Sequence, residues 1–226
     1  MSAQERPEVI VFDVNETLSD MSPMRQVFEE VGAPGHLAAT WFASVLRDGF
    51  ALTVVGESAS FVDLSTAALR TLLDPAALDR SQDDAVEHVM TGFRNLPVHP
   101  DVPPGIEALA EAGLRMVTLS NGSAEVGRSL LERAGLDQHL EAFLSVADVG
   151  IWKPAPRAYQ HALARCGAKA HDAMLVAAHP WDVDGAHRAG LRTAWLDRDG
   201  RAYPSSFSSP DVIATDLVDL ADQVSG

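Results

Sequence analysis

The sequence has a single cysteine, few positive charges and no long apolar run. The one cysteine, Cys166, excludes an intrachain disulfide and is typical of a protein from a reducing compartment. No apolar stretch reaches the roughly 18 residues expected of a membrane-spanning helix, and the N-terminus lacks the apolar segment of a signal peptide. We therefore expect a cytoplasmic protein that does not interact with a membrane.

Positive charge is scarce because 17 lysines and arginines stand against 32 aspartates and glutamates, for a formal net charge of −15. Such a charge disfavours nucleic acid and anionic lipid as partners. The histidines and the cysteine have no spacing typical of a metal site, and we expect no metal and no other cofactor. An anionic small-molecule substrate would need local positive groups or aligned N–H donors.

The chain does contain a regular alternation of short apolar runs and helical patterns. The apolar runs cover residues 9–12, 115–119, 173–177 and 193–196, and a further strand is possible at 142–146. The helical patterns that follow them cover residues 105–112, 124–134, 155–166 and 182–189. This alternation predicts an α/β fold with a doubly wound, mostly parallel sheet.

One long segment breaks the alternation. Helical spacing of apolar residues recurs at 24–31, 36–53, 60–73 and 83–93, and four prolines within residues 97–105 indicate a connection back to the sheet. We expect a core domain of residues 1–18 and 97–226, with a helical cap domain of residues 19–96 above the carboxyl edge of the sheet. The apolar surface of such a cap makes a homodimer possible.

Asp13 follows the first apolar run directly. In an open α/β sheet, ligands bind beyond the carboxyl ends of the strands. A carboxylate at that place can act as a nucleophile and form an ester that water later cleaves. Taken alone, however, an aspartate after a strand more often belongs to a turn or a helix cap.

Three later segments place further polar groups at strand ends. Ser120 and Asn121 follow the second run, although they could equally form a turn. Lys153 precedes a proline that starts a helical pattern, and alone it could be an exposed lysine. His179 and Asp182 follow the 173–177 run at a helix start, where an acid is favourable in any case. Their joint occurrence in this order favours function.

These residues make the sequence resemble the haloacid dehalogenase superfamily over nearly the whole chain. An aspartate after the first strand, a serine, a Lys-Pro pair and a late acidic loop occur in the superfamily's order. Ser120-Asn121-Gly122, Lys153 followed by Tyr159, and Trp181-Asp182 are similar to the L-2-haloacid dehalogenase branch. The resemblance implies hydrolysis of a carbon–halogen bond in a short 2-haloalkanoic acid.

The resemblance also implies roles for individual residues. Asp13 would attack the carbon that bears the leaving group and become an ester. Thr17 and Ser120 would hydrogen-bond around this carboxylate and the substrate, and Asn121 would help hold the leaving halide.

The remaining implied roles concern charge and water. Lys153 would place and neutralise the anionic groups, because clustered carboxylates otherwise raise one another's pKa values. Tyr159 would orient this cluster, although a tyrosine is more often a partly buried core residue. Asp182 would help to activate the water that hydrolyses the ester.

Most members of the superfamily are Mg²⁺-dependent phosphatases, and two residues differ from their pattern. Asn15 stands where a second aspartate would act as general acid, and an amide cannot donate and retake that proton. Ala178 stands where phosphatases place an acidic metal ligand, whereas a hard cation needs several charged oxygens. Three alternatives stay open: such a phosphatase, an SN2 hydrolase for another carboxylate-bearing electrophile, and a catalytically silent binding protein.

The chain also differs from the dehalogenase branch in the cap. The branch carries an arginine directly after a tryptophan, whereas Trp41 is followed by Phe42. Arg47 lies about one and a half helical turns further on, and Arg25 is a more distant candidate. Trp41 could wall the substrate pocket, although core packing is an equal alternative.

His179 is the corresponding difference in the core. His179 stands where the branch has an asparagine, and it could accept a proton from water or donate one to a departing anion. Its alternative role is to cap or pack before Pro180. Trp181 could contribute to the substrate pocket. We count Asn15, Trp41, Phe42, Arg47, Tyr159 and Trp181 as candidate substrate-binding residues.

Overall fold

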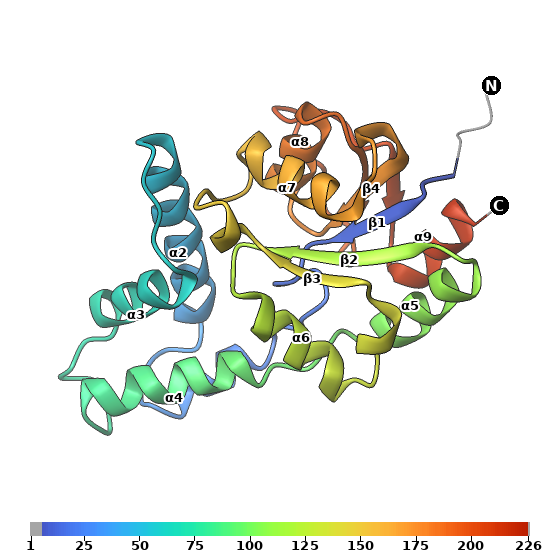
Figure 1. Cartoon of the computed structure of the whole chain (residues 1–226). Coiled ribbons are helices and arrows are strands. Elements are labelled where there is room, and N and C mark those ends of the chain that lie inside the picture. Colours follow the sequence, from blue (N-terminus) through green and yellow to red (C-terminus); the bar gives the residue numbers. More distant parts are fainter. Residues whose placement is uncertain (1–5, 226) are drawn as a thin grey trace.

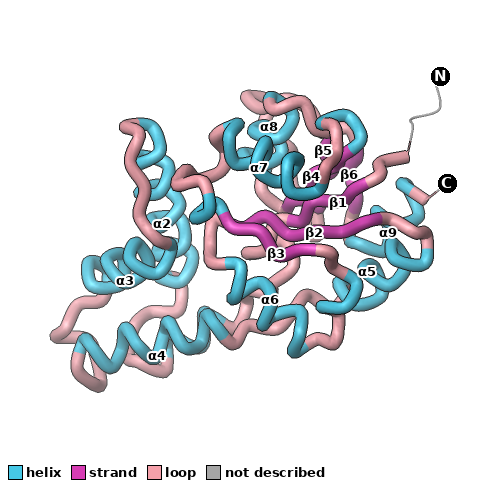
Figure 2. Tube along the Cα trace, viewed as in Figure 1, coloured by secondary structure: helices cyan, strands magenta, loops and turns pink. Residues whose placement is uncertain are grey.

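The computed structural model describes residues 6–225 and contains one six-stranded sheet. Neighbouring strands are parallel throughout, in the order β3-β2-β1-β4-β5-β6. Figures 1 and 2 show helices on both faces of this sheet, so the predicted α/β class is confirmed. The strands are β1 (Val9–Phe12), β2 (Arg115–Ser120), β3 (Ala142–Ser145), β4 (Ala173–Ala177), β5 (Arg192–Leu196) and β6 (Val212–Ala214).

The central strand β1 supplies side chains to both faces because successive residues of a strand point in opposite directions. Val9 and Val11 pack in one apolar cluster with α7 and α8. Ile10 and Phe12 pack in another cluster with α5, α6 and α9. The helices are α5 (Val102–Glu111), α6 (Ala124–Arg133), α7 (Pro156–Cys166), α8 (Pro180–Arg188) and α9 (Leu217–Val224).

Four further helices, here called the cap helices, lie between β1 and α5 in the chain. Figure 1 shows α2, α3 and α4 beside the sheet, toward the end of β1 from which the chain leaves. All four were predicted, with ends that shift by no more than two residues. That they form a separate domain with boundaries at 19 and 96 stays a prediction. The cap helices are α1 (Met24–Glu29), α2 (Leu37–Val54), α3 (Phe61–Leu72) and α4 (Gln82–Arg94).

Trp152 connects the cap helices to the core. Its side chain is buried, its indole N–H donates to the Ala59 carbonyl (3.1 Å), and its backbone N–H donates to the Thr53 hydroxyl (3.2 Å). A Cβ on Gly49 of α2 would lie 2.4 Å from the Trp152 ring. Gly49 is therefore required for the close approach of α2 to the segment that leads into the site.

Gly49→Ala is expected to lower the free energy of unfolding by about 1–3 kcal/mol, because the new methyl group must displace the Trp152 ring. Urea unfolding measures the effect. Gly127→Ala in α6 is the matched control, since a Cβ there meets its nearest neighbour at an ordinary 3.6 Å. The control should be neutral or slightly stabilising, and equal losses in both variants would contradict the contact argument.

Among the strands and α-helices described, two were not predicted. β6 is a three-residue strand at the sheet edge, too short for a period to be recognised, and α9 follows it. The strand at 142–145, predicted only as possible, is present as β3. No helix described within residues 6–225 is long and apolar enough to cross a membrane.

Candidate active site

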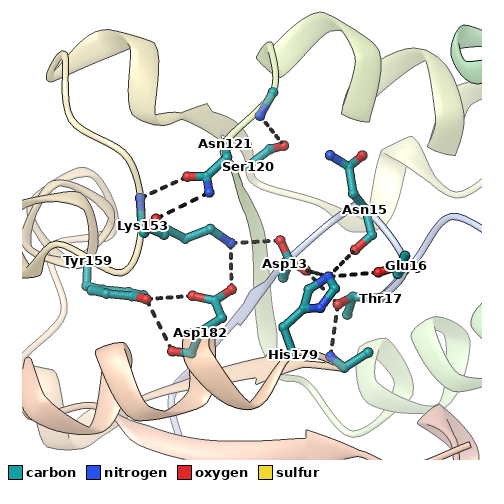
Figure 3. Close-up of polar contacts among 12 residues, drawn as sticks. Asp13, Asn15, Glu16, Thr17, Ser120, Asn121, Lys153, Tyr159, His179 and Asp182 are labelled. Atoms are coloured by element: carbon teal, nitrogen blue, oxygen red, sulfur yellow. Dashed lines mark hydrogen bonds and ion pairs between the residues drawn. The ribbon is translucent and has the colours of Figure 1, made fainter. Parts of the chain in front are cut away.

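Asp13 leaves the sheet on the face that carries α7 and α8. It continues the alternation of Val9 and Val11, and its backbone N–H still donates to the Val176 carbonyl of β4 (3.0 Å). The sheet thus holds the backbone of the residue in register while the side chain points out of the strand end (Figure 3). The residue is 4% exposed, so its carboxylate has lost most of its water.

Thr17 holds one oxygen of this carboxylate. Its hydroxyl donates to Asp13 Oδ2 at 2.7 Å and accepts the backbone N–H of Ala178 at 3.0 Å. Because the backbone N–H engages the hydroxyl oxygen as acceptor, the hydroxyl hydrogen is directed to Asp13. A predicted site residue thus connects the ends of β1 and β4.

Lys153 lies between two carboxylates, as Figure 3 shows. Its Nζ is 2.7 Å from Asp13 Oδ1 and 2.6 Å from Asp182 Oδ2, and the side chain is fully buried. Asn121 holds the backbone here: its Oδ1 accepts the Lys153 N–H (2.8 Å), and its Nδ2 donates to the Lys153 carbonyl (3.4 Å). Asn121 at the end of β2 therefore positions the ammonium group.

The ammonium decides the ionisation of the cluster. Burial, the largest single influence, would raise the pKa of Asp13, but the charges of Lys153 and His179 and the hydrogen bonds from Lys153 and Thr17 together hold that pKa below its usual value. Burial opposes the charge of Lys153 in turn, yet the two carboxylates raise its pKa. Burial raises the pKa of Asp182, and the neighbouring Asp13 charge adds to this rise. Asp13 is thus the more acidic of the two carboxyl groups.

Tyr159 fixes the second carboxylate. Its hydroxyl donates to Asp182 Oδ1 at 2.6 Å, and burial followed by the Asp182 charge raises its pKa well above the usual value. It therefore stays a hydroxyl donor. Gly185 makes room for the ring, since a Cβ there would lie 2.5 Å from the Tyr159 oxygen. The structure supports an orienting role, whereas contact of Tyr159 with substrate stays a prediction.

Tyr159→Phe is expected to reduce kcat about 10-fold and to leave the fold intact. Removing the hydroxyl leaves a buried carboxylate oxygen of Asp182 without its donor, a loss of about 1–3 kcal/mol. Steady-state kinetics and thermal unfolding measure the two effects. Tyr203→Phe is the control, because that hydroxyl contacts only the Pro180 carbonyl at a longer 3.3 Å. Unchanged kcat in Tyr159→Phe would exclude the orienting role.

Ser120 lies at the end of β2, 3% exposed, and its hydroxyl accepts the Gly122 N–H at 2.9 Å. That bond uses the oxygen as acceptor, so the hydroxyl hydrogen is available to another group. Asn15 lies two residues after Asp13, is 9% exposed, and has a side-chain amide that can donate hydrogen bonds. Both residues therefore offer hydrogen-bond donors near Asp13.

His179 borders the site opposite Lys153 in Figure 3. Its Nε2 lies 3.2 Å from the Asn15 carbonyl oxygen. The ring stacks between Phe42 of α2, at 6.2 Å between centroids, and Trp181, at 5.2 Å. Phe42 and Trp181 thus reach the site through this histidine, and α2 contributes an aromatic wall.

Two predicted residues are not brought to this group. Trp41 is fully buried among the cap helices, where its indole N–H donates to the Ser65 carbonyl (3.0 Å). Arg47 is 70% exposed and forms its ion pair with Asp48. Arg25, the more distant candidate, is 73% exposed and lies 3.5 Å from a neighbouring glutamate. In each case the helix face decided the position of the side chain.

Glu16 was missed. Its carboxylate lies 3.5 Å from His179 Nε2, and its backbone adopts the left-handed conformation with φ of 62°. The only available signal was its place between Asp13 and Thr17, because the conformation that turns it toward His179 has no sequence signature. A cavity of about 340 Å³ adjoins this pair and is also lined by Ala178.

Each carboxylate oxygen of Asp13 and Asp182 accepts a hydrogen bond. Lys153 and Thr17 engage the oxygens of Asp13, while Lys153 and Tyr159 engage those of Asp182. Within residues 6–225, no three His, Cys, Asp or Glu side chains are grouped as a metal site. The donor set therefore fits a cluster neutralised by an ammonium group.

Known proteins are similar to this chain in sequence and in fold. Haloacid dehalogenase 4A of Burkholderia cepacia, an (S)-2-haloacid dehalogenase, is 32% identical over 200 residues, or 88% of this chain and 86% of the relative. Haloacetate dehalogenase H-2 of Moraxella sp. is 27% identical over 206 residues, which cover 90% of this chain and 92% of the relative. A dehalogenase crystallised with an intermediate complex has a TM-score of 0.91 at 28% identity, covering 98% of this chain and 99% of its own.

The match to a family model is equally broad. The model of haloacid dehalogenase-like hydrolases covers residues 7–190, a span that includes every group in contact with Asp13. The six-stranded parallel sheet agrees with the fold of the dehalogenase structure that matches 98% of this chain. This chain belongs to the haloacid dehalogenase-like hydrolases.

Proposed function

We propose that the protein hydrolyses the carbon–halogen bond of a short 2-haloalkanoic acid through an ester on Asp13. The observation that carries the proposal is the buried, ionised carboxylate of Asp13 held at the end of β1 by Lys153 and Thr17. Two relatives, an (S)-2-haloacid dehalogenase and a haloacetate dehalogenase, support this substrate class.

In the first step an oxygen of Asp13 displaces the halide from carbon 2. A carboxylate is a weak nucleophile in water, and burial with fixed donors replaces the competing solvent. Lys153 offsets the negative charge of an approaching substrate, so two anions can come together. Ser120 and Asn121 provide neutral donors at the adjoining strand end.

In the second step water attacks the ester carbonyl carbon, Asp13 Cγ. The free carboxylate is regenerated and the 2-hydroxy acid departs. Asp182 supports this step through Lys153, which it holds at 2.6 Å. The raised pKa of Asp182 also makes its carboxylate a better proton acceptor than an ordinary aspartate.

A halide leaves as a stable anion, so displacement at carbon needs no general acid at position 15, where this chain has asparagine. Phosphoryl transfer would require that acid and a metal ion on Asp13 and Asp182. All four oxygens of these carboxylates already accept hydrogen bonds. We therefore expect Mg²⁺ to have no effect on turnover.

A halide-release screen over short 2-halo acids, with and without Mg²⁺, tests the proposal. Haloacetates and both enantiomers of 2-chloropropionate and 2-bromopropionate are the substrates, and a chelator replaces Mg²⁺ in a third arm. Halide release that ignores the chelator is the expected result. Phosphomonoester turnover that needs Mg²⁺, without halide release from any acid, would refute the proposal in favour of a phosphatase.

A further inference from the structure

His179 lies beside Asp13, on the side opposite Lys153, and can carry a proton. His179 Nε2 lies 3.2 Å from the Asn15 carbonyl oxygen, 3.5 Å from Glu16 Oε2 and 3.9 Å from Asp13 Oδ2. All three neighbours are oxygens that accept hydrogen bonds. A ring nitrogen that faces only acceptors carries the hydrogen itself, so His179 presents an N–H toward Asp13.

Glu16 keeps the ring in this state. The Glu16 backbone has a φ of 62°, which is the left-handed conformation and is unfavourable for a residue other than glycine. The Ser19 hydroxyl accepts the Glu16 N–H (3.3 Å) and the Glu16 carbonyl oxygen lies 3.1 Å from His99 Nε2, so the strained backbone is anchored on both sides. The carboxylate is then aimed at His179, as Figure 3 shows, and favours the hydrogen on Nε2.

The two oxygens of Asp13 are not equivalent. Oδ1 accepts from the Lys153 ammonium at 2.7 Å, whereas Oδ2 accepts from the neutral Thr17 hydroxyl at 2.7 Å. A charged donor withdraws more electron density than a neutral one. Oδ2 is therefore the better nucleophile, and it becomes the ester oxygen in the proposed function.

Because Oδ2 is the ester oxygen, the second step requires a proton donor at Oδ2. The water oxygen bonds to Asp13 Cγ, the Cγ–Oδ2 bond breaks, and Oδ2 departs as the alkoxide of the 2-hydroxy acid. Unlike a halide, an alkoxide is a poor leaving group and requires a proton. Lys153 lies on Oδ1, and Thr17 has no means of taking up a replacement proton.

We infer that His179, as an imidazolium that keeps its Nδ1 hydrogen, is the general acid of ester hydrolysis, donating its Nε2 hydrogen to the departing Oδ2, and that Glu16 is its positioning residue. The inference rests on the proposed function. Of the two hydrogens of the attacking water, one restores His179 and the other, first accepted by Asp182, passes to solvent, so Asp13 ends as a carboxylate. The 340 Å³ cavity lined by Glu16 and His179 provides the exchange with solvent. The 3.9 Å separation must shorten in the ester, as catalytic hydrogen bonds commonly do.

His179→Asn separates the two steps. With 2-bromopropionate, we expect one equivalent of bromide at a rate within about 3-fold of wild type, then ester breakdown slowed roughly 10²–10³-fold. Rapid-quench bromide assays and the intact mass of the Asp13 ester measure the two phases. The ester from 2-bromo-3,3-difluoropropionate has a more stable alkoxide, so its breakdown should be slowed less, by about 10-fold.

Glu16→Gln should show the same pattern with a smaller deficit, about 10-fold in ester breakdown alone. This side chain is 42% exposed, so the variant tests the inference even if His179→Asn misfolds. His171→Asn, with a ring that is 70% exposed, is the control and should match wild type.

Three outcomes would overturn the inference. Slowed bromide release without accumulation of ester would place His179 in the first step. Equal deficits with the two substrates would exclude proton donation to the alkoxide. Wild-type protein that releases no bromide and forms no adduct would instead refute the proposed function itself, together with everything built on it.

Discussion

Asp13→Asn is expected to abolish halide release, with a loss of roughly four orders of magnitude or more, as for other enzymes that lose their nucleophile. The amide is isosteric with the carboxylate but has neither its charge nor its nucleophilic oxygen. Lys153 keeps one carboxylate partner, Asp182, so the fold should persist. Halide assays, with circular dichroism as a check on folding, measure the result.

The origin of the new oxygen sharpens this experiment. In ¹⁸O water, one turnover of wild type should place ¹⁸O in Asp13 and leave the first molecule of hydroxy acid unlabelled, because the product oxygen comes from the carboxylate. Peptide mass spectrometry locates the label. Asp83→Asn is the control, since that carboxylate is 78% exposed and pairs with Arg70. Full halide release by Asp13→Asn would refute the nucleophile assignment.

Lys153→Met is expected to cost both activity and stability. The ammonium is the only group that contacts both Asp13 and Asp182 among the described residues, and its removal leaves two buried carboxylates without a counter-charge. Breaking a buried pair in this way costs about 3–5 kcal/mol. Activity should fall at least about 10³-fold, because protonation of Asp13 removes the nucleophile.

The pH dependence of stability should change sign in this variant. In wild type the pKa of Asp13 is lowered, so its contribution is present above the unfolded pKa and is lost as the pH falls through the folded pKa. Without Lys153 the pKa of Asp13 should rise above its unfolded value, and the pKa of Asp182, which burial already raises, should rise further. The resulting penalty applies at high pH and disappears as the pH falls through the raised values. The variant should therefore recover part of its stability at pH 5 relative to pH 8.

Urea unfolding of Lys153→Met at both pH values tests this expectation. The chain offers a natural control, since its other lysine, Lys169, is exposed. Lys169→Met should leave stability and activity unchanged at either pH. A loss in Lys153→Met that is equal at both pH values would show that packing of the long side chain, not its charge, stabilises the cluster.

Much of the architecture could be predicted because buried parallel strands are short apolar runs. β1, β2, β4 and β5 are all runs of this kind, and both faces of the sheet are covered. β6 was missed because a three-residue edge strand with an exposed Ile213 has neither a continuous run nor a clear period. The cap helices were predicted because their apolar residues repeat at helical spacing.

The site was predicted in part for a related reason. The predicted residues lie at the end of a strand, as Asp13 and Ser120 do, or in the first turn of a helix, as Asp182 does. Parallel strands bring their carboxyl ends to the same edge of the sheet. The pairing within that edge was not predictable from spacing. That Lys153 contacts Asp13 across 140 positions of sequence, at 2.7 Å, depends on how α7 and α8 pack on the sheet.

The cap shows where sequence reasoning failed to place side chains. Phe42 and Trp41 are adjacent in the sequence, but one step along a helix rotates the side chain by about 100°, since a turn holds 3.6 residues. Phe42 therefore stacks on His179, whereas Trp41 enters the interior of the cap. Which of two neighbours faces the core depends on how α2 docks, and Gly49 allows α2 to approach the Trp152 ring closely.

By itself, the sequence determined the parallel sheet, the helical insertion after the first strand and the aspartate at the strand end, because periodicity and strand length are local properties. Only the tertiary structure decided which charges surround Asp13: Lys153 on one oxygen, and His179 with Glu16 beside the other. Ionisation depends on burial and on distances of a few ångströms. Those distances arise from packing between distant segments, which no local pattern encodes.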